Sequence, residues 1–397
     1  MSDPVIVGAA RTPIGNFNGA LSSVAAVDLA ATVIAEALRR AGVSGDRVDD
    51  VILGNVLSAG LGQNVARQAA LRAGISESTP AMAINQLCGS GLRAVAAAGQ
   101  QVRLGDASVV VAGGAENMTR TPYLLEHARD GYRMGHGQLY DSVLRDGLWC
   151  ALTDVHMGTT ADNIAVDFAI SREDQDAFAA ASQRKACHAI ATGVFDAEII
   201  AVEVVQRGGD PIRFAVDEHP RPGTTVEVLA KLRPAFDSHG TVTAGNASGI
   251  SDGAAALVVM GRDAQTAAGI APLAVIRSWA TVGVSPRIMG MGPVKAIPLA
   301  LAKAGLRLGD IELIELNEAF ASQGLAVIRE LKIDPEITNV NGGAIALGHP
   351  VGASGARVLT TLLYEMARRE VRFGLASLCI GGGQGIAMVV ERERGAQ

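Results

Sequence analysis

One cysteine in the chain has neighbours that would make it a nucleophile. Cys88 lies in the run Asn-Gln-Leu-Cys-Gly-Ser-Gly, residues 85–91, after an expected strand and before an expected helix that starts near Leu92. Free amides and the dipole at a helix N-terminus favour the thiolate, and the amides can hold the oxyanion of a sulfur-bound acyl group. A buried structural cysteine is the alternative. The flanking glycines indicate close backbone approach, which favours the nucleophile.

A histidine occupies a second glycine-rich turn. His349 lies in Gly-His-Pro, residues 348–350, between Asn-Val-Asn-Gly-Gly at 339–343 and Gly-Ala-Ser-Gly at 352–355. A lone histidine is usually structural. Here the glycines admit unusual backbone angles and Pro350 stiffens the turn, so the pattern favours a positioned general base.

A second cysteine ends another expected strand. Cys379 begins the run Cys-Ile-Gly-Gly-Gly, residues 379–383, which would place a thiol beside free amide donors. A dinucleotide-binding loop is the rival interpretation. Only 14 residues follow Gly383, and residues 386–390 are typical of another strand, so there is no room for the required βαβ unit.

An asparagine completes the set. Asn317, in Glu-Leu-Asn-Glu-Ala-Phe at residues 315–320, would lie where a strand enters a helix, and a simple N-cap is the alternative. In α/β architectures, sites assemble at the carboxyl ends of strands, and all four positions fall there. Two thiols, an imidazole and an amide predict acyl transfer combined with proton abstraction, with no metal required.

These positions need a scaffold of alternating strands and helices. Short β-branched runs such as residues 108–111 alternate with alanine-rich helical stretches, which is the pattern of βαβ units. The helix and strand over residues 30–55 are similar to those over 299–317. Residues 81–114 are similar to residues 338–381. Residues 81–114 contain a strand, a Gly-Ser-Gly turn, a helix and a second strand, so the comparison predicts a first strand at 338–340. Two related halves are the economical explanation, and chance similarity of βαβ segments is the alternative.

Between the halves, residues 120–250 carry six of the seven histidines and an expected helix over 172–192, which indicates an insertion rich in loops. The length of 397 residues predicts two or three domains. With 49% apolar residues and 47 glycines, the composition is typical of a compact α/β enzyme. A net charge of −6 and 4% aromatic residues offer no surface for nucleic acid.

The four cysteines, which are Cys88, Cys150, Cys187 and Cys379, form no CxxC pair. This spacing fits neither a disulfide framework nor a zinc site and indicates a reducing compartment. No apolar run approaches the roughly 18 residues that a membrane span needs, and a strand-like segment begins at Pro4 with no visible signal segment. We therefore expect a cytoplasmic protein without a membrane partner, although a processed organellar protein would look the same.

At its four motifs the sequence resembles the thiolase family and, over essentially the whole chain, the biosynthetic acetyl-CoA acetyltransferase branch of that family. These motifs rarely occur together otherwise. The resemblance implies that Cys88 takes the acyl group, that His349 activates it, and that Cys379 moves the α-proton of a second acyl-CoA. It also implies that Asn317 orients a water in one oxyanion hole, while the amides of Cys88 and Gly381 form another.

The fold implied by the resemblance is α/β with five layers, α-β-α-β-α. Residues 1–120 plus 247–270 would form the N-terminal half, 121–246 a CoA-binding loop domain, and 271–397 the C-terminal half. A homotetramer, a dimer of dimers, is usual for this branch. The expected partners are acetyl-CoA, acetoacetyl-CoA and CoA, which are substrates, so no cofactor is expected. A role in fatty acid metabolism is implied as well.

The resemblance also implies a set of substrate-binding residues, any of which could instead be an ordinary packing residue: Leu148, His156, Met157, Arg221, Phe236, Ala244, Ser248, Met289, Ala319 and Phe320. Arg221 would offset the negative charge of CoA. Met157 and Met289 resemble the short-chain branch, where bulky side chains crowd a long acyl tail. The sequence departs from the family pattern at four positions near the expected CoA loop: Trp149, Cys150, Val155 and Val228.

The expected activity is therefore acetyl-CoA C-acetyltransferase, which condenses two acetyl-CoA molecules through an acyl-cysteine and catalyses thiolysis in reverse. The nearest rival is a degradative or broad-range 3-ketoacyl-CoA thiolase. Carrier-protein ketosynthases share the fold idea but normally lack a second active-site cysteine, so Cys379 argues against them. A catalytically inactive acyl-CoA binder is disfavoured because all four reactive positions are filled.

Overall fold

Two sets of strands form the centre of the molecule, and they have the same order and directions apart from β4, which lies at the edge of the first set and has no counterpart in the second. The computed structural model describes residues 2–206 and 208–393. The first set has the order β4-β3-β5-β12-β1, in which β3 is parallel to both of its neighbours and the other pairs are antiparallel. The second has the order β14-β15-β16-β13, with β14 and β15 parallel and the rest antiparallel. Two residue pairs between β1 and β13 join the sets.

The strands of these sets are β1 (Pro4–Arg11), β3 (Asp50–Gly54), β4 (Ala81–Ile84), β5 (Val109–Asn117), β12 (Ser251–Gly261), β13 (Ala274–Gly283), β14 (Leu313–Leu316), β15 (Phe373–Ile380) and β16 (Gln384–Glu391), and β2 (Gly15–Asn16) pairs with β12. The helices are α1 (Ala26–Ala41), α2 (Val65–Arg72), α3 (Ser90–Leu104), α4 (Met157–Asp167), α5 (Arg172–Ala191), α6 (Val226–Leu229), α7 (Arg262–Ala267), α8 (Gly292–Ala304), α9 (Ala321–Leu331), α10 (Ala344–Leu347) and α11 (Ser354–Arg369). Short segments of tighter or wider helix are η1 (Gly45–Arg47), η2 (Val143–Leu148), η3 (Pro286–Met291), η4 (Leu308–Asp310) and η5 (Pro335–Ile337).

The internal repeat predicted from the sequence is confirmed by this topology. The pair α1–β3 corresponds to α8–β14, and α3–β5 corresponds to α11–β15. The strand predicted at 338–340 is wrong, because Thr338 makes only a single parallel bridge to Ile314. Asn339 has a φ of +44°, which turns the chain, and its side-chain amide bonds both the N–H and the C=O of Leu316. The side chain thereby takes the place of a paired strand at this edge.

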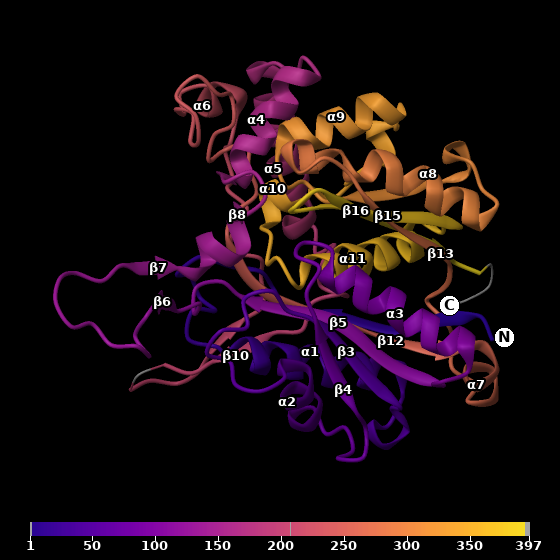
Figure 1. Ribbon diagram of the computed structural model, residues 1–397. Helices are drawn as coiled ribbons and strands as arrows, with labels where there is room; N and C mark the ends of the chain where they lie inside the picture. Colours follow the sequence, from indigo (N-terminus) through magenta and orange to yellow (C-terminus); the bar gives the residue numbers. More distant parts are fainter. Residues whose placement is uncertain (1, 207, 394–397) are drawn as a thin grey trace.

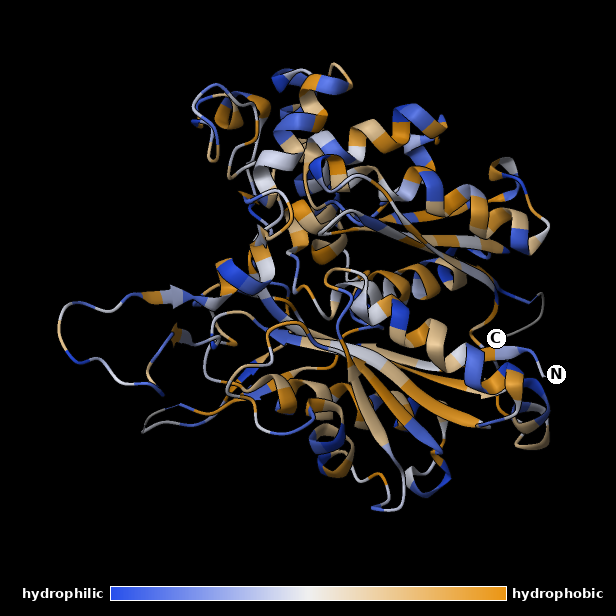
Figure 2. Ribbon diagram, in the orientation of Figure 1, coloured by the Kyte–Doolittle hydropathy of each residue, from blue (hydrophilic) through white to orange (hydrophobic). Residues whose placement is uncertain are grey.

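Three apolar clusters show how the layers pack. One lies between the first sheet and α1 and α2, one between the two sheets around α3 and α11, and one between the second sheet and α8 and α9. Along β5, Val109 and Val111 face the first cluster whereas Val110 and Ala112 face the second, as the two-residue period of a doubly covered strand requires. The described chain is thus layered α-β-α-β-α (Figure 1), and its strands are largely apolar (Figure 2).

The segment between β5 and β12 adds short hairpins and helices on one side of these layers. Its strands pair locally as β6 (Tyr123–Leu125) with β7 (Leu139–Asp141), β8 (Trp149–Cys150) with β9 (Val155–His156), and β10 (Val202–Val204) with β11 (Ile212–Phe214). Helices α4 and α5 pack on α9, while the β6–β7 hairpin projects from the body (Figure 1). The domain boundaries expected at 120, 246 and 270 stay a prediction. Within the described residues, every helix is too short or too polar to cross a bilayer.

Candidate active site

A tight turn between β4 and α3 presents the thiol of Cys88. Leu87 has a φ of +47°, and its N–H is accepted by Asn85 Oδ1 at 2.9 Å. Ser90 Oγ accepts the N–H of Gln86 at 2.8 Å and donates to the C=O of Leu87 at 2.7 Å. These bonds hold a backbone conformation that leucine rarely adopts. The helix begins at Ser90, two residues before the predicted start, so Cys88 stands just outside its first turn.

The protonation state of Cys88 differs from the expectation drawn from its helix. Burial raises the pKa of Cys88 to about 11, and a hydrogen bond from the backbone amide of Gly381 offsets only part of that effect. Loss of hydration therefore outweighs the helix N-terminus and the amides, and the resting group is a thiol. A thiol in this state needs a base close by before it can attack a thioester.

His349 is held in the form that such a base requires. Its Nδ1 lies 2.5 Å from Ser354 Oγ, and that hydroxyl already donates its single hydrogen to the C=O of Pro350 at 2.9 Å. The proton must then sit on Nδ1, which leaves the lone pair on Nε2. Burial lowers the pKa of His349 to about 4, and the charge of Arg357 acts in the same direction. His349 Nε2 has no hydrogen-bond partner among the described residues, so it is free to accept a proton.

Cys379 and Asn317 lie at the ends of two adjacent parallel strands. Cys379, on β15, is fully buried; burial raises its pKa above the ordinary range, and the charge that Cys88 would carry raises it further. Asn317 follows β14, and its N–H donates to the C=O of Ser377 on β15 at 2.9 Å. Within the described part of the chain, neither polar atom of the buried Asn317 amide has a partner. The amide is therefore available to a water or a ligand.

A cavity of about 320 Å³ is lined by some of the reactive groups and by most of the predicted substrate-binding residues, but not by Cys379 or Asn317. Cys88, His349 and Gly381 line it, together with Leu148, His156, Met157, Phe236, Ala244, Ser248, Met289, Ala319 and Phe320. Cys379 lies behind this lining, packed in a cluster with Met157, Met289 and Phe320. Arg221 is exposed and does not line the cavity, and its N–H donates to Gln183 Oε1 at 2.8 Å.

Aromatic rings and methionines make one wall of this cavity. The rings of His156 and Phe236 stack with centroids 4.5 Å apart, and Phe320 meets Phe236 edge-on at 6.3 Å. His156 Nδ1 accepts the N–H of Gly158 at 3.0 Å, which caps α4. A Cβ on Gly158 would lie 2.1 Å from the Phe236 ring, so only glycine allows this stack. The wall leaves an apolar space of limited size beside Cys88.

A neighbouring cavity of about 590 Å³ shares Gly147, Met157 and Gly381 with the first. Trp149 and Cys150, two of the departures from the family pattern, line only this neighbouring cavity. Val155, on β9, and Val228, on α6, line neither of the two.

Several residues of the site were not predicted from the sequence. Met118, Ile250 and Val351 line the reactive cavity, but they belong to no motif. The sequence marks Ser354 only as part of the Gly-Ala-Ser-Gly turn, but its hydroxyl lies 2.5 Å from His349 Nδ1 and orients the imidazole. The candidate site residues therefore include Ser354 as well.

Comparison with known proteins gives matches over nearly the whole chain. Residues 4–263 match the family described as "Thiolase, N-terminal domain" and residues 270–392 match "Thiolase, C-terminal domain". The chain is 58% identical to an acetyl-CoA acetyltransferase of Escherichia coli over 99% of this chain and 100% of that protein. It is 56% identical to one of Pseudomonas aeruginosa over the same shares. A crystal structure of the Bacillus anthracis acetyl-CoA acetyltransferase superposes with a TM-score of 0.97 at 44% identity, covering 98% of this chain and 99% of that one.

Proposed function

Because the chain belongs to the thiolase family, we propose that it is an acetyl-CoA acetyltransferase, condensing two acetyl-CoA molecules to acetoacetyl-CoA and CoA and catalysing thiolysis in reverse. The observation that carries the proposal is a small cavity lined by the thiol of Cys88 and a neutral imidazole, with a second thiol, that of Cys379, packed directly behind its wall. One thiol and a base suffice for acyl transfer alone. A second thiol supplies the group that a condensation needs in addition. The names of the similar proteins from Escherichia coli and Pseudomonas aeruginosa support the same activity.

In the first half-reaction His349 Nε2 removes the proton of Cys88 as the sulfur attacks the carbonyl of acetyl-CoA. The backbone amides of Cys88 and Gly381 stabilise the oxyanion that forms. Collapse of the intermediate breaks the bond to the CoA sulfur, which leaves with the proton held by His349. The products are free CoA and an acetyl group on Cys88.

In the second half-reaction Cys379 first gives its own proton to His349 or to solvent, and the resulting thiolate removes a proton from the methyl carbon of another acetyl-CoA. The enolate oxygen of that thioester is stabilised by the oxyanion hole in which Asn317 orients a water. The carbanion attacks the acetyl carbonyl on Cys88, a carbon–carbon bond forms, and the Cys88–acyl bond breaks. Acetoacetyl-CoA leaves, Cys379 keeps the substrate proton, and the released Cys88 takes up the proton that Cys379 gave to His349 or to solvent, so both thiols are restored.

Acyl-chain preference follows from the cavity wall. Met157, Met289 and Phe320 are buried and pack around Cys379, so an acyl chain longer than acetyl or acetoacetyl would have to displace them. Overfilling a packed apolar site typically costs about 1–3 kcal/mol. The rival activity, a broad-range 3-ketoacyl-CoA thiolase, predicts no such loss with chain length.

Thiolysis rates decide between the two activities. The specificity constant kcat/KM should be highest for acetoacetyl-CoA. It should be lower by about 10-fold or more for 3-ketohexanoyl-CoA and should fall further for 3-ketodecanoyl-CoA. Release of CoA from acetyl-CoA alone, followed with a thiol reagent, should accompany formation of acetoacetyl-CoA. Equal rates along the series would favour the broad-range enzyme. Absence of CoA release by folded protein would reject the proposed function.

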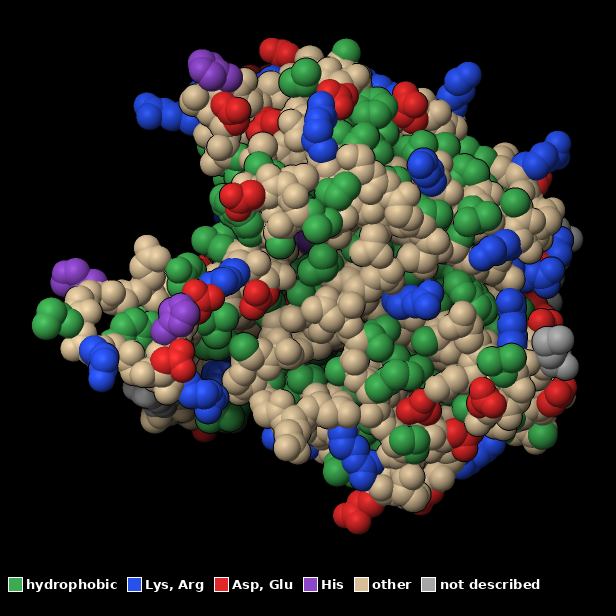
Figure 3. Space-filling model, viewed as in Figure 1, with side chains coloured by type: hydrophobic (Ala, Val, Ile, Leu, Met, Phe, Trp, Pro, Cys, Tyr) green, Lys and Arg blue, Asp and Glu red, His purple; other side chains and the backbone are tan. Residues whose placement is uncertain are grey.

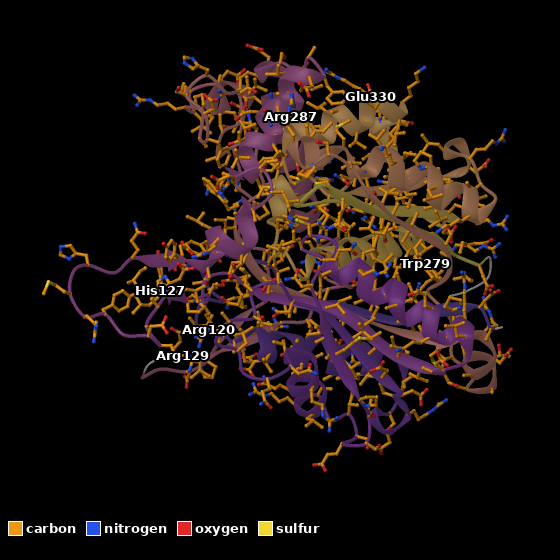
Figure 4. All side chains as sticks on the ribbon, in the orientation of Figure 1. Arg120, His127, Arg129, Trp279, Arg287 and Glu330 are labelled. Carbon is orange, nitrogen blue, oxygen red and sulfur yellow. The ribbon has the colours of Figure 1, made fainter. Side chains whose placement is uncertain are left out.

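We propose in addition that the chain forms a homotetramer, a dimer of dimers. Supporting this, the β6–β7 hairpin projects from the body with exposed hydrophobic side chains, among them Tyr123, Leu139 and the 97% exposed Met134. Figure 3 shows hydrophobic, basic and histidine side chains together on this projection, and Figure 4 places His127 and Arg129 on it. An isolated hairpin is marginally stable, so a second copy is the occupant that we propose for it. Light scattering should give four times the mass of one 40.8 kDa chain.

The remaining proposals concern cellular context. We propose a cytoplasmic protein, and four free thiols fit a reducing compartment. We propose a role in fatty acid metabolism because acetyl-CoA and acetoacetyl-CoA are the proposed substrates. CoA thioesters enter and leave as substrates, so no separate cofactor is proposed.

A further inference from the structure

A buried carboxylate lies where the two halves of the chain meet. Glu116, near the end of β5, has no exposed surface. Its Oε2 accepts the N–H of Val56 at 3.0 Å and the N–H of Gly352 at 2.9 Å. Its Oε1 accepts the N–H of Leu57 and the side-chain amide of Asn55, both at 3.0 Å. Four donors from both halves of the chain therefore converge on one side chain.

The internal repeat shows which position this residue occupies. Gly54 on β3 pairs with Gly114 on β5, as Leu316 on β14 pairs with Ser377 on β15. The residue after each first strand is an asparagine, Asn55 in one half and Asn317 in the other. Glu116 stands two residues beyond Gly114, and Cys379 stands two residues beyond Ser377. Each of the two lies opposite a glycine of the next strand, which is Gly253 for Glu116 and Gly385 for Cys379. Glu116 is thus the counterpart of Cys379.

The partner of Glu116 follows the same symmetry. Residues 353–355 in the second half correspond to residues 89–91 in the first. Gly352 directly precedes the former and Cys88 directly precedes the latter, so Gly352 is the counterpart of Cys88. The backbone of Gly352 fills the place where the other half holds a nucleophile. Figure 1 shows α3 and α11, the two helices that begin after these turns, side by side between the sheets.

The approach of the two halves here is as close as backbone allows. A Cβ on Gly114 would lie 2.1 Å from the C=O of Gly352, and one on Gly54 would lie 2.6 Å from it. The N–H of Gly352 points to Glu116 while its C=O enters this glycine-lined space, so both of its polar groups lie against the first half. Gly352 is three residues from His349, in the turn that holds the imidazole.

We propose that Glu116 is a positioning residue: its carboxylate fixes the turn of His349 to the strand end beside the Cys88 turn, and so sets the geometry between base and nucleophile. The proposal rests on the proposed acylation of Cys88. The position that carries Cys379 in the second half carries Glu116 in the first, where its carboxylate acts as a clamp by hydrogen bonding both halves. The clamp closes the symmetry-related space to substrate and holds the two catalytic turns together.

A carboxylate suits this role better than a neutral side chain. Both oxygens accept two N–H groups each, and an acceptor-only group can satisfy all four donors. Burial raises the pKa of Glu116 to about 7, whereas the backbone hydrogen bonds act against that rise. A glutamine at this position must turn its NH₂ group toward one pair of donors. At least one backbone N–H, of Val56, Leu57 or Gly352, then faces another donor and loses its bond.

The test compares Glu116→Gln with Glu36→Gln. Glu36 is a buried carboxyl on α1 that bonds to Arg39 and Arg40 of the same helix, so its variant reports the general cost of losing a buried carboxylate. The rate at which Cys88 is acetylated from radiolabelled acetyl-CoA is measured by rapid quench, and KM is measured separately. We expect Glu116→Gln to slow acetylation at least 10-fold with KM changed less than threefold, since displacements of about 1 Å can cost 100-fold. Glu36→Gln should acetylate within twofold of the wild type.

The regional pattern of hydrogen exchange separates a local effect at the two turns from a general loss of stability, which would accelerate exchange throughout the protein. In Glu116→Gln, exchange should accelerate in peptides covering residues 349–353 and 55–57, and it should match the wild type elsewhere. If Glu116→Gln does not fold, Asn55→Ala carries the test, because it removes one of the four donors and leaves the carboxylate in place. We expect it to slow acetylation at least threefold without a change in KM.

Three results would overturn the inference: acetylation within twofold of the wild type in the folded variant, a rise in KM equal to the fall in rate, or faster exchange spread evenly over the chain. A wild-type protein that forms no acetyl-Cys88 would instead reject the proposed function. The two failures are therefore distinguishable.

Discussion

Replacing His349 with glutamine should expose how protonated Cys88 is at rest. With a pKa of about 11, only about one thiol in 10⁴ is ionised at pH 7. His349 is not among the groups that shift this pKa, so the variant should keep it. Without the base, acetylation depends on that small thiolate fraction, and general base catalysis typically contributes about 100- to 10,000-fold. We expect acetylation of Cys88 to fall by a factor in that range.

The pH dependence gives the sharper part of this prediction. The pKa of His349 is about 4, so its Nε2 is unprotonated above that value and loses its function as pH falls through it. Wild-type acetylation should therefore be flat between about pH 8 and pH 9, where Glu116, with a pKa of about 7, is ionised as well. In His349→Gln the thiolate fraction grows tenfold per pH unit below the pKa of Cys88, so the logarithm of the rate should rise with a slope near one.

The assay is rapid-quench acetylation from labelled acetyl-CoA, with the acetyl group located by mass spectrometry. His127→Gln is a matched control, because His127 is an exposed histidine on the projecting hairpin. It should behave as the wild type at every pH. A His349→Gln variant whose residual rate is independent of pH would refute the reasoning, since it would show that Cys88 is already ionised or that another group is its base.

Three further predictions use single substitutions or labelling. In Cys379→Ser, acetylation of Cys88 should survive better than acetoacetyl-CoA formation, and equal loss of both in folded protein would mean that Cys379 also serves acylation. Limiting iodoacetamide should label Cys88 first, because His349 lines the same cavity and can take its proton during the attack, whereas Cys150 is buried. Acetyl-CoA should protect Cys88. Cys150 is the competitor to watch, because burial raises its pKa less than hydrogen bonds from Thr153 and Leu152 lower it. Labelling of Cys150 first with activity intact would reject Cys88 as nucleophile. Arg221→Ala should raise the KM for acetyl-CoA more than it lowers kcat, by a factor corresponding to about 1 kcal/mol at most, and unchanged constants would make Arg221 an ordinary surface residue.

Much of the fold could be predicted because both halves show the same sequence pattern of strands, glycine-containing turns and helices. Strands such as β5 carry continuous β-branched runs, and the turns that follow carry glycines where the two halves approach each other. The failure at 338–340 has a definite cause. The side-chain amide of Asn339 makes the hydrogen bonds that the repeat predicts for a paired backbone strand. One side chain that takes over backbone hydrogen bonds leaves the hydrophobic periodicity unchanged, so the sequence pattern does not reveal it.

The candidate site was predictable by residue type but not by charge state. Motifs place a thiol before a helix, and a helix N-terminus favours the thiolate. How much water surrounds the sulfur depends on what packs against it from distant segments, such as Val351 and Ile250. Burial by these long-range contacts raises the pKa of Cys88, whereas the helix N-terminus alone would lower it. Glu116 was missed for a related reason, because its partners come from the other half of the chain and no local motif surrounds it.

The two elevated thiol pKa values also order the proposed steps. Burial raises the pKa of Cys379, and a negative charge on Cys88 raises it further, so the two sulfurs cannot readily be ionised together. An acetylated Cys88 has no ionisable proton and carries no charge. Before acetylation Cys88, whose pKa is about 11, is the thiol that the base ionises first. Once Cys88 is acetylated, Cys379 is the thiol left for the base to ionise, so its thiolate forms when the acceptor for the carbanion is already in place.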